Sequence, residues 1–252
     1  MTTPKSPSTS RRHFIQALTV APAVGVLGTA LGGCSDRPAA AGGAVGTLPD
    51  GRMAARSEDA KYEPRYFTPA EWSFLAAAVD RLIPANEDGP GALEAGVPEF
   101  LDREMESDYG HGGLWYMQGP FLPDTPPTLG YQLRFTPREL YRNGIAAVER
   151  WCSKQHGKAF ADLDEASRDD ILGKLEHGGI ELDTVPAASF FALLLTNTKE
   201  GYLSDPMYGG NKHMGSWKMI GFPGARADFI DWSEKPNTTY PLGPVSLRGE
   251  RA

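Results

Sequence analysis

Cysteine is scarce in this chain, with two residues, Cys34 and Cys152, among 252. Covalent attachment of a c-type haem requires a Cys-x-x-Cys-His motif, and the sequence contains none. Two cysteines so far apart in sequence also cannot form the disulfide network that stabilises small secreted domains. The chain therefore carries no covalently bound haem of its own and must rely on a hydrophobic core.

The motifs of other cofactors are missing as well. No G-x-G-x-x-G follows a predicted strand, which excludes the usual dinucleotide-binding turn. The five histidines are scattered without a pair four residues apart, so no helical zinc site is predicted. The G-x-S-x-G motif of serine hydrolases is also absent. We expect no catalytic, cofactor-binding or metal-binding residue in this chain, which then performs no chemistry alone.

Basic residues are outnumbered by acidic ones. Removing residues 1–34, which hold three basic residues and no acidic one, lowers the basic count from 25 to 22 against 32 acidic residues, a net charge of −10. Such a charge opposes binding to nucleic acid and to anionic lipid. Neither is expected as a partner.

What the N-terminus does contain is an export signal. Arg11 and Arg12, with Phe14, precede an apolar run over residues 17–31. At about 15 residues this run is shorter than the roughly 20 that span a bilayer, and it suits a removable signal. Paired arginines address a protein to the twin-arginine (Tat) translocase, which exports folded proteins. We therefore predict a periplasmic protein with a signal peptide over residues 1–34.

The end of the signal allows two outcomes. Cys34 follows Leu31, Gly32 and Gly33 in a pattern that resembles a lipobox, where the cysteine becomes lipidated. Residues 39–41 offer a competing small-residue cleavage site instead. Residues 35–61 are rich in Ala, Gly and Pro without an apolar period, which predicts a flexible linker. Membrane contact is expected only through such a lipid anchor or through a larger complex.

Helical patterns dominate the remaining chain. Thr68 and Thr136 are each followed by proline and, three residues later, by glutamate, which is the capping box that begins a helix. We expect Gly201 to cap the C-terminus of the last helix. The sequence predicts a mainly α fold, with one domain over residues 62–235 and an extended tail over 236–252. About five helices are predicted, over residues 69–83, 98–107, 137–151, 165–177 and 186–200.

Long loops separate these helices. Residues 84–97, 108–135 and 202–224 are dense in glycine, proline and aromatic side chains. Loops of this length are uncommon in compact domains unless they bind something, and their aromatic residues argue against disorder. The aromatic side chains either pack on their own helices or contact a partner protein.

The loop over residues 202–224 is the strongest candidate for partner binding. Its Asp-Pro and Gly-Gly-Asn sequences favour tight turns, so we expect a rigid loop that presents Tyr208, Trp217 and Phe222. Cys152 is expected either as a buried thiol or as one half of a disulfide to the partner. The predicted partner-binding residues are Asp205, Pro206, Tyr208, Gly209, Gly210, Asn211, Trp217, Phe222 and Pro223.

Two groups of residues carry a resemblance to a known family. The first comprises Tyr66, Phe67, Thr68, Pro69, Glu71, Asp80, Arg81, Leu82, Ile83, Pro84, Gly89, Pro90, Gly91, Ala92, Ala95, Gly96, Val97 and Pro98. The second comprises Glu200, Gly201, Tyr202, Asp205, Pro206, Tyr208, Gly209, Gly210, Asn211, Gly215, Trp217, Lys218, Gly221, Phe222, Pro223 and Gly224. Together they resemble the gluconate 2-dehydrogenase subunit 3 family over about residues 60–230.

The resemblance implies a partner and a role. Members accompany a large FAD-containing flavoprotein of the glucose-methanol-choline class, often with a cytochrome c subunit, and the large subunit oxidises CH-OH groups of sugars, sugar acids or polyols. The small subunit is implicated in export and stability, as a chaperone would be. The alternative function is a stand-alone exported lipoprotein that binds a small ligand through its aromatic loops.

Overall fold

A computed structural model describes residues 62–123 and 125–252 of the chain. The predicted signal and linker, with Arg11, Arg12, Phe14 and Cys34, lie outside the described residues. Within the described residues the fold is helical and contains no β-strand, which confirms the mainly α prediction. The α-helices are α2 (Pro69–Leu82), α3 (Val97–Glu106), α4 (Pro137–His156), α5 (Glu165–Glu176), α6 (Ala187–Leu203) and α7 (Gly215–Ile220).

Two helices begin as predicted. The Thr68 side chain accepts a hydrogen bond from the Glu71 amide, and the Glu71 carboxylate accepts one from the Thr68 amide at 2.8 Å. Thr136 and Glu139 make the same reciprocal pair at the start of α4. These capping boxes satisfy amide groups that have no partner inside the helix, so local sequence alone fixes both starting points.

The predicted end of α6 was wrong. Gly201 does not cap the helix, which continues to Leu203. A Cβ atom at Gly201 would lie 2.6 Å from Phe100 Cδ1 on α3. Glycine is therefore required where α3 and α6 cross closely, and the crossing could not be inferred from local sequence.

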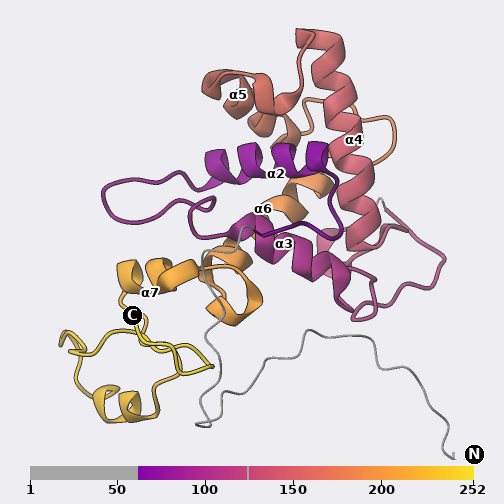
Figure 1. Ribbon diagram of the computed structural model, residues 1–252. Helices are drawn as coiled ribbons and strands as arrows, with labels where there is room; N and C mark the ends of the chain where they lie inside the picture. The colour runs from indigo at the N-terminus through magenta and orange to yellow at the C-terminus, as the bar shows by residue number, and fades with distance from the viewer. Residues whose placement is uncertain (1–61, 124) are drawn as a thin grey trace, which may run out of the picture. The chain divides into compact units, whose positions relative to one another are not determined.

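Helix α6 lies at the centre of the bundle, where it packs against α2, α3, α4, α5 and α7 (Figure 1). The core is apolar and aromatic, with Phe74, Tyr141 and Phe190 fully buried. The Tyr141 hydroxyl donates to Asn197 Oδ1 at 3.2 Å, so the buried phenol keeps a hydrogen-bond partner. In the described part of the chain, none of the helices is both long and apolar enough to cross a bilayer.

Asp102 on α3 holds residues 62–67, the first described segment of the chain, against the helices. Its carboxylate is fully buried and accepts hydrogen bonds from the Tyr62 hydroxyl and from the amides of Arg65, Tyr66 and Phe67, at 2.8–3.0 Å. A buried charge is tolerated only when hydrogen bonds replace its lost hydration, and four donors do so here. Sequence reasoning missed this residue because its partners lie 35 or more positions away.

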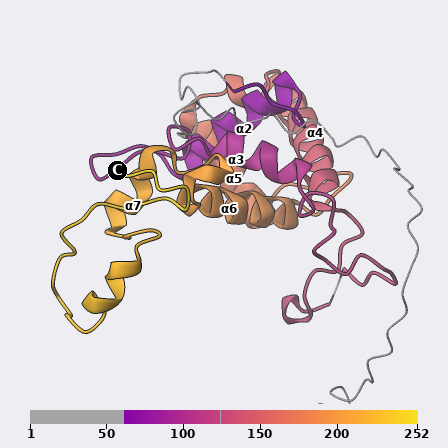
Figure 2. The same cartoon turned by 60° about the horizontal axis from the view of Figure 1, so that its bottom comes forward.

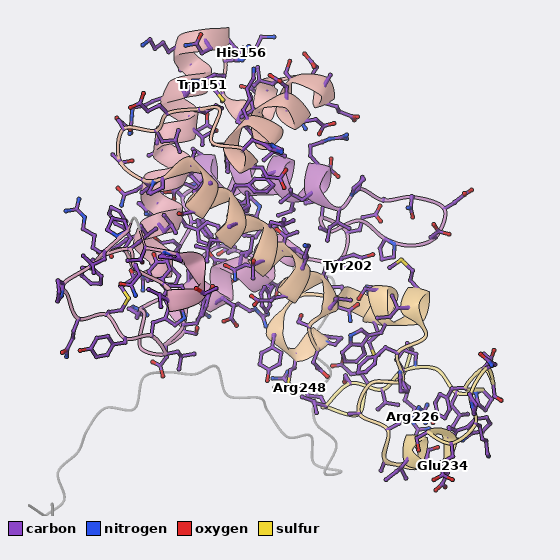
Figure 3. All side chains as sticks on the ribbon, turned by 180° about the vertical axis from the view of Figure 1, so that it is seen from behind. Trp151, His156, Tyr202, Arg226, Glu234 and Arg248 are labelled. Atoms are coloured by element: carbon purple, nitrogen blue, oxygen red, sulfur yellow. The ribbon has the colours of Figure 1, made fainter. Side chains whose placement is uncertain are left out.

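The C-terminal segment, residues 225–252, returns to the helical domain. Its Val245 pairs with Gly224 in an isolated bridge, and the Ala225 amide donates to Val245 O at 2.8 Å. Between these contacts the segment contains a short 3-10 helix, Ala227–Trp232. Figure 3 shows its Arg226 and Glu234 away from the helical bundle, whereas Tyr202 lies where α6 meets α7.

Candidate docking surface

Two loops that are distant in sequence form one structural unit. The loop between α2 and α3 lies beside α7 and the loop that precedes it (Figure 1). The Tyr202 hydroxyl donates to Pro90 O at 2.7 Å, and the Lys212 amide donates to Ala95 O at 3.0 Å. Lys212 Nζ also lies 2.8 Å from Glu99 Oε2 on α3. The two sequence signatures therefore belong to a single scaffold.

Gly209 and Gly210 allow the backbone of this unit to pack closely. Gly209 has φ 101°, a conformation that favours glycine. A Cβ atom at Gly210 would lie 2.1 Å from Gly201 O, so the loop backbone contacts the last turn of α6 directly. Gly209 and Gly210, both predicted to bind a partner, are buried and contribute to the backbone packing of the loop.

Asn211 is the polar centre of the loop. It is fully buried at φ 44°, which asparagine tolerates better than most residues. Its Nδ2 donates to Ser204 O at 3.0 Å, and its Oδ1 accepts from the Ser216 amide at 3.1 Å. The amide side chain thus ties the end of α6 to the start of α7.

Asp205, which follows α6 after Ser204, joins the loop to the C-terminal segment. Its carboxylate accepts from the Met207 amide at 3.0 Å, within the turn that Pro206 begins. The other carboxylate oxygen accepts from the Leu247 amide at 2.7 Å. Because Asp205 is buried, both bonds are shielded from water. The residue clamps two segments of this chain together.

Trp217 differs from the expectation that it would be presented to a partner. Its side chain is 6% exposed, and Nε1 donates to Leu203 O at 2.8 Å. The indole ring supports Phe222 from below, with ring centroids 5.1 Å apart. Pro223 is also buried and accepts from the Val245 amide at 3.2 Å. The expected exposure of Trp217 was therefore wrong, whereas Phe222 and Tyr208 are each nearly half exposed.

Large apolar side chains are exposed around this scaffold. We define the docking surface as Leu93, Leu203, Tyr208, Met219, Ile220 and Phe222, each at least 41% exposed. Met219 Sδ lies 2.9 Å from the position that a Cβ atom on Gly89 would take, which places α7 over the other loop. Four of the six were missed by sequence reasoning, because turn-forming residues have a local sequence pattern and the apolar residues beside them have none.

Cys152 is fully buried within α4, and burial raises the pKa of its thiol to about 12. The buried thiol is the outcome that the helical context favours. A disulfide to a partner would first require α4 to expose this side chain. Figure 3 shows the neighbouring Trp151 near one end of α4, on the far side of the bundle from Tyr202.

Two other kinds of site, a metal site and a ligand-binding cleft, were sought among the described residues. Among them, no group of three His, Cys, Asp or Glu side chains is placed to hold a metal ion. A cleft of about 460 Å³ lies at the start of α4, where Arg138 and Arg142 stack over the Tyr66 ring. Arg142 pairs with Glu71 at 2.7 Å, and Arg138 contacts His111. These arginines hold Tyr66 against α4, which is a structural role.

Comparison with known proteins agrees with the geometry of the two loops. The family model for gluconate 2-dehydrogenase subunit 3 matches residues 69–224. This range contains helices α2 to α7, the loop between α2 and α3, and the loop between α6 and α7. No curated protein and no solved structure matches the chain. The chain therefore belongs to the gluconate 2-dehydrogenase subunit 3 family and is a subunit of a multi-subunit dehydrogenase complex.

Proposed function

We propose that this chain is the non-catalytic small subunit of a periplasmic FAD-dependent dehydrogenase of the glucose-methanol-choline class. The large subunit holds FAD and oxidises a sugar, sugar acid or polyol, and a cytochrome c subunit can accept its electrons. The small subunit escorts the folded flavoprotein through the twin-arginine translocase and stabilises it. The observation that carries this proposal is the docking surface, in which exposed apolar side chains surround a scaffold whose buried polar side chains, among the described residues, all have hydrogen-bond partners.

The scaffold favours protein binding because it is already ordered. Asn211 and Asp205 fix the backbone, and Trp217 supports Phe222, so little conformational entropy is lost when a partner binds. Aromatic anchors with restricted rotamers are typical of the side chains that dominate interface energies. Tyr208 and Phe222 are the two aromatic members of the surface, and we assign them this role.

The export role rests on Arg11, Arg12 and Phe14 together with the family membership. Transport of a folded chain is useful when a cofactor must be inserted before crossing the membrane. FAD in the large subunit meets this condition, so one signal on the small subunit serves both chains. We expect the gene beside this one to encode a flavoprotein without an export signal. Lipidation at Cys34 would then hold the complex at the membrane.

Co-purification tests the docking surface. The chain and the neighbouring flavoprotein are co-expressed, and the affinity of the purified pair is measured for the wild type, Tyr208→Ala and Phe222→Ala. Loss of an aromatic anchor costs about 1–2 kcal/mol, which weakens binding roughly 5- to 30-fold. Lys154→Ala is the control, because Lys154 is exposed on α4 between Trp151 and His156, at the end of the bundle away from Tyr202 (Figure 3).

One result of this experiment supports the proposal and two results contradict it. Weaker binding of both aromatic variants with an unchanged control supports the proposal. Wild-type affinity in both variants, with unchanged melting temperatures, rejects docking through this surface. If the flavoprotein never binds the wild-type chain, but sugars raise the melting temperature of the chain alone, the ligand-binding alternative replaces the proposal.

A further inference from the structure

A second exposed apolar region lies far along the chain from the docking surface. We define the arm as residues 109–133, between α3 and α4. Four of its large apolar side chains are more exposed than most members of the docking surface. They are Leu114 (71%), Tyr116 (80%), Leu122 (56%) and Leu129 (63%). An exposed group of this kind marks an interaction site more often than an ordinary surface does.

The base of the arm is ordered by buried contacts. The Tyr109 hydroxyl accepts from Asn197 Nδ2 on α6 at 2.8 Å, and the Arg138 amide of α4 donates to Gly110 O at 3.2 Å. The ring centroids of Trp115 and Tyr131 lie 4.4 Å apart, so the two ends of the arm are in contact. Trp115 and Tyr131 are thus used inside the arm, and the exposed side chains are left for an outside contact. The base of the arm is therefore held on α4 and α6 before a partner binds, which limits the entropy lost on binding.

Charge identifies the kind of partner. Between residues 109 and 133 the sequence contains no lysine, arginine or glutamate, and one histidine (His111) and one aspartate (Asp124). Binding to bacterial lipid surfaces usually combines apolar side chains with basic residues that attract anionic headgroups. The net charge of −10 beyond residue 34 would oppose such a membrane. An uncharged, apolar groove on a protein is the surface that complements the arm.

The positions of the two regions point to one partner. The arm leaves the bundle beside α4, and the docking surface lies at the other end, around α7 (Figure 1). Figure 2 shows the arm and the C-terminal segment extending beyond the helices on the same side. A single rigid body placed on that side could contact the arm and the α7 region together.

We propose that the arm is a second anchor for the same FAD-containing large subunit, so that the small subunit holds its partner at two separated points. This inference rests on the proposed function. Two linked contacts bind more tightly than either alone, because the second contact forms within a complex that the first has already made. Loss of the arm should therefore lower affinity even though the docking surface is intact.

The test uses the full chain, the co-expressed neighbouring flavoprotein and two variants of the arm. Leu114→Ser with Tyr116→Ser is one double variant, and Leu122→Ser with Leu129→Ser is the other. We expect each to weaken binding at least tenfold, with an unchanged melting temperature because the replaced side chains are exposed. Lys154→Ser is the control, since Lys154 is exposed on α4 between Trp151 and His156, at the end of the bundle away from Tyr202 (Figure 3), and should leave binding unchanged.

Each other result contradicts a different statement. If Phe222→Ala weakens binding while both arm variants bind like the wild type, the second anchor is wrong and the docking surface stands. If the arm variants and Phe222→Ala all bind like the wild type, the proposed function fails as well. If the arm variants lose only binding to vesicles of phosphatidylethanolamine and phosphatidylglycerol, the arm is a lipid contact and the inference is overturned.

Discussion

Replacing Asp205 by Asn should release the C-terminal segment while the helical bundle stays folded. The carboxylate accepts from the amides of Met207 and Leu247 at 3.0 and 2.7 Å. An Asn side chain has one acceptor oxygen and one NH₂ group, so whichever way it is oriented a donor faces one of these amides. The variant thus loses one hydrogen bond and leaves a buried donor unsatisfied.

The size of the effect follows from the charge and burial of Asp205. A hydrogen bond to a charged group contributes about 1.5–3 kcal/mol, and Asp205 is too buried for water to replace it. If the segment opens locally, its amides should exchange with deuterium roughly 10- to 150-fold faster, because each 1.4 kcal/mol is a factor of ten. Residues 244–252 should respond, since their amides bond within this segment and to Pro223 O.

Hydrogen–deuterium exchange read by mass spectrometry measures this opening. Peptides from α3 and α4 should keep wild-type protection, because Asp205 makes no hydrogen bond to these helices. Asp228→Asn is the matched control, since Asp228 is an exposed carboxylate that accepts from the Tyr240 hydroxyl at 3.0 Å. Exchange in residues 244–252 that stays within about threefold of the wild type would refute the clamp.

Two further predictions concern the interior. Gly201→Ala should lower the free energy of unfolding by about 1–3 kcal/mol, because its Cβ atom would overlap Phe100. Gly173→Ala on α5 should instead raise it by up to about 1 kcal/mol in the same denaturant titration, because a Cβ atom there would meet nothing within 4 Å apart from the neighbouring backbone of its own helix. Equal stability of Gly201→Ala and the wild type would contradict the close crossing. Cys152 should resist alkylation at pH 8 in the folded chain and react after unfolding, since burial raises its pKa to about 12. Rapid labelling of the native chain, or a heavier band on a non-reducing gel of the complex, would show an accessible or bridged thiol.

Local sequence predicted the helices well because their starting signals are local. Thr68 and Thr136 bond to groups three residues away, so a short window holds both partners. The six-residue helix α7 escaped prediction because it is too short to show an apolar period between Gly215 and Gly221. Gly201 was misassigned for a related reason, since its function depends on Phe100 in another helix.

The sequence singled out the loop over residues 202–224 as a binding loop, but it did not distinguish the residues that hold this loop together from those that are exposed on it. Asp205, Asn211 and Trp217 are buried and hold the loop together. Unusual turns require particular residues, so a distinctive motif identifies the scaffold of a surface more readily than the surface itself. The exposed members Met219 and Ile220 carry no local signal of this kind. Tyr208 and Phe222 are the motif residues that also remain exposed.

The central claim is that this subunit binds the flavoprotein and carries it across the membrane. The most direct measurement is FAD-linked dehydrogenase activity in the periplasm of cells that co-express both subunits, compared with cells that carry Arg11→Lys and Arg12→Lys. We predict that the wild type delivers both subunits and the activity to the periplasm, and that the variant retains all three in the cytoplasm. Full periplasmic activity in cells that lack this chain or carry the variant would contradict the claim.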